Sequence, residues 1–180
     1  TQSNSSLTPG IAYFSDAIRD AIKGSVFDAE EPGYVNGNIK KASGIKNGVL
    51  GTPSWSPAPT QTVTYASCHD NYTLWDKINS SNPNDSEADK IKQNLLSAAI
   101  VYTSQGIPFI QAGEEFLRTK VKADGTFESN SYASPDSVNL LDYSRITDYK
   151  EVYNYYKGLI SFRKAHSAFR MTSAEDVNKY

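Results

Sequence analysis

The stretch 62-TVTYASCHDNYTLWDKI-78 joins a predicted strand, a polar tripeptide and a predicted helix start. Residues 63–68 favour a strand, because β-branched and aromatic side chains are enriched in strands. His69, Asp70 and Asn71 follow at once and supply an imidazole, a carboxylate and an amide. Polar groups at the carboxyl end of a buried strand are typical of the active-site rim of an α/β barrel. We therefore expect a parallel α/β fold with this tripeptide at its functional edge.

Helix signals after the tripeptide complete this strand–helix unit. Thr73 and Asp76 have the spacing of a capping box, and so have Ser86 and Asp89. The helix after Ser86 is expected to end near Gly106, because the proline two residues later prevents its continuation. Its predicted apolar face consists of Ile91, Leu95, Ala98, Ala99 and Tyr102.

Similar units lie on both sides of this one. In the first, an apolar run at residues 11–14 precedes Ser15 as a cap and Gly24 as a helix stop. The helical stripe between them is Ala17, Ile18, Ala21 and Ile22. In the third, residues 107–113 suit a parallel strand buried on both faces, and a helix spans about 149–168. This last helix carries Val152, Tyr156, Leu159, Ile160 and Arg163.

Three such units predict a parallel sheet with right-handed crossovers. The units alone leave it undecided whether the sheet is open or closed. Long loops are expected at residues 25–61 and 120–142, and loops of this length are usually functional or are insertions. We expect irregular helix inside the first loop and Trp55 to anchor that loop against the body.

Composition limits the classes of function. The 180 residues, 38% hydrophobic and 21% charged, suffice for one domain with a core. The net charge of −2 argues against nucleic acid or an anionic membrane as the main partner. No apolar stretch is long enough to span a bilayer. Residues 1–10 lack the features of a signal peptide, and the single cysteine, Cys68, excludes an internal disulfide. These two features leave both a cytoplasmic and a secreted or cell-surface location open.

The residues around the tripeptide offer two other chemistries. Ser67 or Cys68 could act with His69 in an unrelated hydrolase, but adjacent strand residues point to opposite faces. Cys68 is more simply a small buried residue. His69 and His166 are remote in the sequence, and no metal-binding pattern is present, so no metal site is predicted.

Two carboxylates, Glu114 and Glu115, follow the third strand. One is expected to enter a hydrogen-bond network while the other faces solvent, and a catalytic acid motif is the alternative. His69 taken alone is more often a core histidine with satisfied ring nitrogens. The surrounding sequence decides between these interpretations.

Four stretches in order resemble the pullulanase type of the α-amylase superfamily of glycoside hydrolases. They are 18-IRDAIKGSVFDAEEPGYVNG-37, 65-YASCHDNYTLWDKI-78, 107-IPFIQAGEEFLRTK-120 and 130-NSYASPDSVNLLDY-143. The resemblance covers about residues 11–169. It implies a (β/α)8 barrel whose last three units occupy residues 11–170, between an N-terminal loop at 1–10 and a tail or following domain at 171–180.

The resemblance also implies cleavage of α-1,6 linkages in pullulan, glycogen or branched dextrins. The implied mechanism is retaining and uses an aspartate nucleophile and a glutamate acid. Both are expected upstream of Ile11, because neither Arg19-Asp20 nor Gly113-Glu114 fits the family motifs. We therefore expect a C-terminal piece of a catalytic domain that is inactive alone and stable chiefly against the rest of the barrel.

In the family, the residues that match His69 and Asp70 contact the sugar at the cleavage point. Asp70 would stabilise the transition state without being the nucleophile. Asn71 is a further expected sugar contact, and Asp136 and Asn139 are weaker candidates. Because strand alternation would separate His69 from Asp70, the strand must end or bend at His69.

The partners that the resemblance implies are an α-glucan substrate and the missing N-terminal barrel portion. No cofactor is implied; calcium occurs in some relatives, but no ligand set is evident in this chain. The rival interpretation is a non-catalytic amylase-like domain kept for binding or assembly. The intact His69-Asp70-Asn71 tripeptide weighs against it, and Trp75, although tempting as a stacking platform, is expected to pack.

Overall fold

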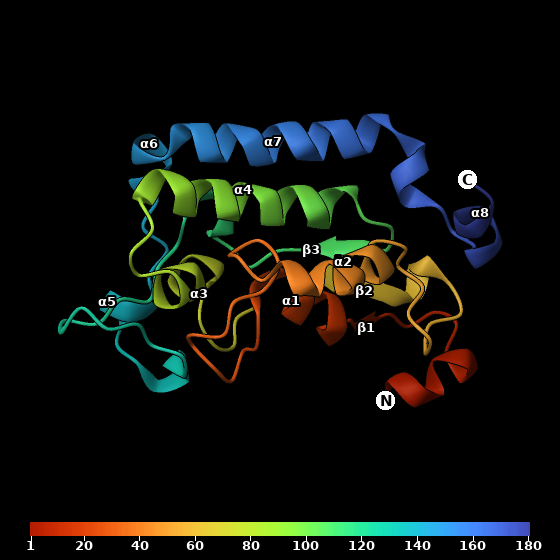
Figure 1. Ribbon diagram of the computed structural model, residues 1–180, viewed down its shortest axis with the longest axis horizontal. Coiled ribbons are helices and arrows are strands. Elements are labelled where there is room, and N and C mark those ends of the chain that lie inside the picture. Colours follow the sequence, from red (N-terminus) through yellow and green to blue (C-terminus); the bar gives the residue numbers. More distant parts are fainter.

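Three short strands form one parallel sheet in the order β1 (Tyr13–Phe14), β2 (Thr62–Tyr65) and β3 (Ile107–Phe109). The computed structural model describes residues 1–180 (Figure 1). Val63 is in register with both Phe14 and Ile107. The predicted parallel arrangement is confirmed, but each strand is shorter than its apolar run.

Each strand is followed by one or two main helices. The main helices are α1 (Asp16–Lys23) after β1, α3 (Leu74–Ser81) and α4 (Glu87–Thr103) after β2, and α7 (Lys150–Ala165) after β3. Helix α4 contacts both β3 and α7, and α7 runs along its outer side (Figure 1). No helix is both long and apolar enough to cross a membrane.

Shorter helices lie in the connections and at the ends. They are η1 (Gln2–Leu7), η2 (Ile39–Lys41), α2 (Ala42–Gly48), η3 (Pro59–Gln61), η4 (Glu114–Phe116), η5 (Ser131–Ala133), α5 (Asp136–Asn139), α6 (Arg145–Asp148), η6 (Ser167–Arg170) and α8 (Ala174–Lys179). The first long loop therefore contains the helix expected there. Trp55 anchors that loop, with its ring edge-on to Tyr13 at a centroid distance of 6.2 Å.

The helix caps follow the predictions with one exception. The hydroxyls of Thr73 and Ser86 accept hydrogen bonds from the N–H groups of the third helical residues, both at 3.1 Å. Gly24 ends α1 with φ 89°, and a Cβ there would lie 2.0 Å from the carbonyl oxygen of Glu31. Ser15 stands at the N-cap of α1, where its N–H donates to Val63 O at 3.0 Å, but its side chain makes no capping bond.

The core consists of two clusters that meet at α4. One contains Ile18, Ile22, Val35, Ala66, Leu74, Ile78, Ile100 and Val101. The other contains Trp75, Ala98, Tyr102, Leu117, Val152 and Tyr156. Because α4 is covered on two sides, it buries a wider face than its predicted stripe, on which Ile91 and Leu95 are only partly buried. Trp75 packs, as expected.

Arg163 on α7 binds the turn between α4 and β3. Its guanidinium donates to the carbonyl oxygens of Tyr102, Ser104 and Gly106 at 2.9, 2.6 and 2.7 Å. The last carbonyl groups of a helix lack partners within the helix, so this side chain satisfies them while joining two units. Helix α7 ends at Ala165, earlier than the predicted limit, because His166 leaves the helical region with ψ 101°.

The two ends of the chain contain short helices. Within residues 1–10, expected to be a loop, η1 is held by Gln61, whose amide donates to Ser5 O at 2.8 Å and Thr8 O at 2.9 Å. Within residues 171–180, Ser173 caps α8.

Glu114 is the buried member of the carboxylate pair and joins the segment after β2 to α7. Its carboxylate accepts a hydrogen bond from Ser67 Oγ at 2.5 Å. Tyr156 Oη lies 3.2 Å from Glu114 Oε1 and 2.9 Å from Asn94 Oδ1, and its single proton serves one of them at a time. Burial raises the pKa of Glu114 to about 7, against the hydrogen bond from Ser67 and the charge of Lys23. Burial likewise lowers the pKa of Lys23 to about 8.

We expect Glu114→Gln to remove a pH dependence of stability. Between about pH 4.5 and about pH 7, folded protein keeps a proton on Glu114 that the unfolded chain has released. The wild type therefore loses stability as the pH rises through this window. The variant cannot ionise, so its stability relative to the wild type should rise by about 3 kcal/mol across the window.

Because the chain is expected to be stable chiefly against the rest of the barrel, urea unfolding of the complete catalytic domain, as wild type and as Glu114→Gln, measures the effect across this pH window. Glu115→Gln, at the half-buried neighbouring carboxylate, is the matched control and should keep the wild-type slope. Parallel curves for wild type and Glu114→Gln would contradict the prediction.

Candidate functional site

The predicted tripeptide lies beyond the end of its strand. Strand β2 stops at Tyr65, so His69 and Asp70 belong to a turn and are not held to opposite faces. Asn71 has φ 63°, in the left-handed region that asparagine tolerates better than most residues. Leu117 is the other non-glycine residue with positive φ, at 58°. Backbone strain of this kind persists where surrounding contacts impose it, and these two residues lie in the two loops that meet at the site.

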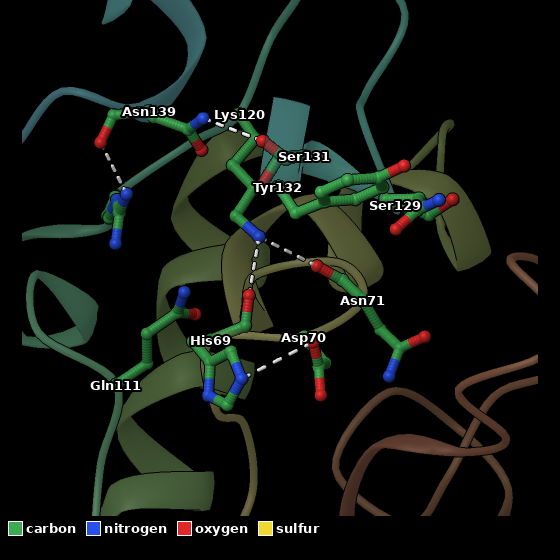
Figure 2. A pocket seen from close by; sticks show the side chains of 11 residues that line it. His69, Asp70, Asn71, Gln111, Lys120, Ser129, Ser131, Tyr132 and Asn139 are labelled. Atoms are coloured by element: carbon green, nitrogen blue, oxygen red, sulfur yellow. Dashed lines mark hydrogen bonds and ion pairs between the residues drawn. The ribbon is translucent and has the colours of Figure 1, made fainter. Parts of the chain in front are cut away.

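His69 and Asp70 present their side chains to solvent, next to each other. His69 Nε2 lies 3.4 Å from Asp70 Oδ1, and the side chains are 87% and 72% exposed (Figure 2). The expectation that His69 alone would be a core histidine is thus wrong for this chain. A contact between two exposed polar side chains adds little stability, so packing does not explain the position of this pair.

Lys120 holds the backbone of the turn in place. Its ammonium group donates to the carbonyl oxygens of His69 at 2.9 Å and Asn71 at 3.1 Å (Figure 2). These two carbonyls flank Asp70, so the pair of bonds fixes the segment that carries the carboxylate. Lys120 is only 1% exposed, and burial lowers its pKa, as does the nearby charge of Arg118.

Asp76 fixes Lys120 in turn. Its carboxylate accepts from Thr119 Oγ1 at 2.6 Å and from the N–H of Lys120 at 2.8 Å. Asp76 is fully buried at the first turn of α3, and burial raises its pKa, opposed by these hydrogen bonds. The residue that completes the capping-box spacing with Thr73 therefore ties the start of α3 to the loop after β3.

A polar cavity of about 200 Å³ opens above the turn. Among the residues predicted for the site, the cavity gathers His69, Asp70, Asn71 and Asn139. Asp136, at the start of α5, is exposed and does not line the cavity. The amide of Asn139 is committed to the protein, because Nδ2 donates to Ser131 O at 2.7 Å and Ser134 O at 3.1 Å.

Residues not singled out from the sequence complete the wall. Gln111, Arg118 and Lys120 come from the segment after β3, and residues 129–132 come from the second long loop. Tyr132 is the one aromatic residue on the wall and is 88% exposed. All of these residues lie in or next to the stretches 107–120 and 130–143, which resemble family motifs. That resemblance is the only feature of the sequence that points to them.

The geometry does not support a serine or cysteine nucleophile. Ser67 is fully buried, and its hydroxyl donates to Glu114. No hydrogen bond joins Ser67 or Cys68 to His69. The structure contains no group of three or more histidine, cysteine or acidic residues arranged to hold a metal ion.

The chain is similar to known proteins over nearly all of its length. No protein-family model matches it. It is 40% identical over 183 residues to a pullulanase of Bacillus subtilis strain 168, covering 98% of this chain and 25% of that protein. It is 32% identical over 127 residues to an isoamylase of Pseudomonas amyloderamosa, covering 71% of this chain and 15% of that protein.

Solved structures agree with this relationship. A pullulanase from Bacillus acidopullulyticus superposes with a TM-score of 0.90 at 46% identity, covering 96% of this chain and 21% of that one. A pullulanase variant from Paenibacillus barengoltzii complexed with maltotetraose superposes with a TM-score of 0.93 at 41% identity. The match covers 100% of this chain and 28% of that one. The chain spans about a quarter of the length of the pullulanases it matches. By sequence and by structure, the chain belongs with the pullulanases, as the counterpart of one segment of those longer proteins.

Proposed function

We propose that this chain supplies the rim of the active site in a retaining debranching glycoside hydrolase that cleaves α-1,6-glucosidic linkages. The observation that carries the proposal is the pair His69 and Asp70, exposed together in a polar cavity, on a chain whose relatives are pullulanases. The complex of a related pullulanase with maltotetraose supports an α-glucan as the substrate. The exposed ring of Tyr132 on the same wall suits stacking against a sugar.

The fold proposed for the longer protein is a (β/α)8 barrel to which residues 11–170 contribute three consecutive units. Parallel strands in chain order, each followed by a helix, support it. Strands β1 and β3 each have one neighbour, so both edges of the sheet are free to pair. Phe14 and Phe109 on these edge strands are 43% and 37% exposed, as expected for a face that another part of the protein would cover.

The carboxylates on the cavity wall limit the chemical roles that this chain would have in the longer protein. Retaining hydrolysis uses a nucleophile and an acid about 5 Å apart. Asp70 is the single carboxylate on the cavity wall, so this wall cannot supply both reacting groups. The resemblance to the pullulanases assigns both of them to residues outside this chain. Asp70 and His69 would then bind hydroxyl groups of the glucosyl unit and stabilise the positive charge that develops as the bond breaks. No cofactor is proposed for this step.

One observation also fits a second candidate, a glucan-binding domain without activity, because a wall with one carboxylate would serve binding alone. Activity of the longer protein separates the two. Hydrolysis of pullulan supports the enzyme, whereas binding of maltotetraose without hydrolysis supports the binding domain.

The purified chain alone should release no reducing sugar from pullulan, because it lacks the two reacting carboxylates.

The purified chain should also fail to give a sharp thermal transition as a monodisperse monomer, since its sheet edges and apolar face are uncovered. Light scattering and a thermal melt measure the second point. A cooperative monomer, or activity that Asp70→Asn abolishes, would contradict these expectations.

In the longer protein, Asp70→Asn should lower turnover on pullulan by about 10²- to 10⁴-fold, from the loss of roughly 3–5 kcal/mol of transition-state stabilisation. The folded state should be unaffected, because the side chain is exposed. Asp148→Asn, at an exposed carboxylate of α6 away from the cavity, is the matched control. Near-normal turnover of Asp70→Asn would refute the proposed role.

Lys120→Met in the longer protein should reduce turnover by about ten- to hundredfold. Methionine fills similar space but leaves the carbonyls of His69 and Asn71 without their donor, so Asp70 loses its fixed position. Kinetics on pullulan measure this, with circular dichroism as a check of folding. Lys150→Met, at an exposed lysine, should behave as wild type, and equal turnover of both variants would count against the role of Lys120.

A further inference from the structure

Gln111 is a buried side chain on the cavity wall that the protein leaves without a partner. It lies two residues beyond β3 and is 6% exposed. Its Nε2 is fully buried and makes no hydrogen bond, and no protein group binds its Oε1. It lines the same cavity as His69 and Asp70 (Figure 2).

A buried amide without hydrogen bonds is costly, and native proteins keep few such groups. Three other polar side chains on this wall make hydrogen bonds within the protein. Lys120 Nζ binds two carbonyls, Asn139 Nδ2 binds Ser131 O, and Arg118 Nη2 donates to Asn139 O at 2.6 Å. Arg118 Nε is a second buried donor on this wall with no partner. The wall therefore has two hydrogen-bond donors without a protein partner, which suits a ligand that carries oxygen atoms.

The chemistry of the amide selects the kind of ligand. A glutamine amide both donates and accepts, and it can turn to present either group. An inorganic anion offers only acceptors, and an ammonium ion only donors. A sugar hydroxyl offers both on one atom, which matches the amide in either orientation.

We propose that Gln111 is a substrate-binding residue that hydrogen-bonds a hydroxyl group of the glucosyl unit held at Asp70. The inference rests on the proposed function and adds to the site a residue from the segment after β3. It gives that segment two tasks in one cavity: Lys120 fixes the turn beneath Asp70, and Gln111 binds the sugar.

The test uses the longer protein and compares Gln111→Met with Gln111→Glu. Methionine keeps the volume and removes both hydrogen-bonding functions, whereas glutamate keeps an acceptor. Calorimetry with maltotetraose should show binding weakened about tenfold or more by Gln111→Met and less by Gln111→Glu. The value of kcat/KM on pullulan should fall in the same order.

Gln93→Met is the matched control. Gln93 lies on α4 outside the cavity, and its Oε1 is also buried without a partner, so its loss should not alter sugar binding. Monodeoxy derivatives of the maltooligosaccharide locate the contact. The derivative that lacks the contacted hydroxyl should bind wild type and Gln111→Met equally.

Unchanged binding and kinetics of Gln111→Met would overturn the proposal. So would a lower melting temperature of the unliganded variant with unchanged binding, because the amide would then have its partner elsewhere in the longer protein. A wild-type protein that neither binds maltotetraose nor cleaves pullulan would overturn the proposed function, and the role of Gln111 with it.

Discussion

The buried carboxylate of Asp76 is the constraint on which the rest of the site depends. It binds the N–H of Lys120 and the hydroxyl of Thr119, and so fixes the loop after β3 against the start of α3. Lys120 then holds the carbonyls of His69 and Asn71. Hydrogen bonds to charged groups contribute more than neutral ones, and leaving either charge unpaired in the interior would be strongly unfavourable. The turn is therefore rigid although its side chains are free.

This arrangement separates the groups that hold the structure from the groups that we propose to contact a ligand. Asp76, Lys120 and Glu114 are buried and bonded within the protein, whereas His69 and Asp70 are exposed and contact little besides each other. A carboxylate that must stabilise charge on a sugar works best when its backbone is fixed in advance and its oxygens are free. The Gln111 amide fits the same pattern, because it is positioned by burial yet unbonded.

Much of the fold could be predicted from local pattern. The order of strands and helices, the caps at Thr73 and Ser86, and the stop at Gly24 depend on neighbouring residues, and the structure confirms them. Strand lengths were overestimated, because pairing ends where the chain turns toward the loops and not where apolar residues stop. Ser15 occupies the cap position without a side-chain capping bond, and its backbone N–H extends the parallel pairing to Val63.

The sequence by itself determined the alternation of strands and helices, the kinship with the pullulanases, and His69 and Asp70 as the residues of interest. These depend on residue type and spacing along the chain. Only the tertiary structure decided that Lys120 and Asp76 support that pair, that Gln111 joins it, and that Asp136 stays outside the cavity. Such contacts join residues more than forty positions apart in the chain. They depend on how α3 packs against α1 and α4 and on how the loops after β2 and β3 meet, and no local pattern of residues encodes these long-range contacts.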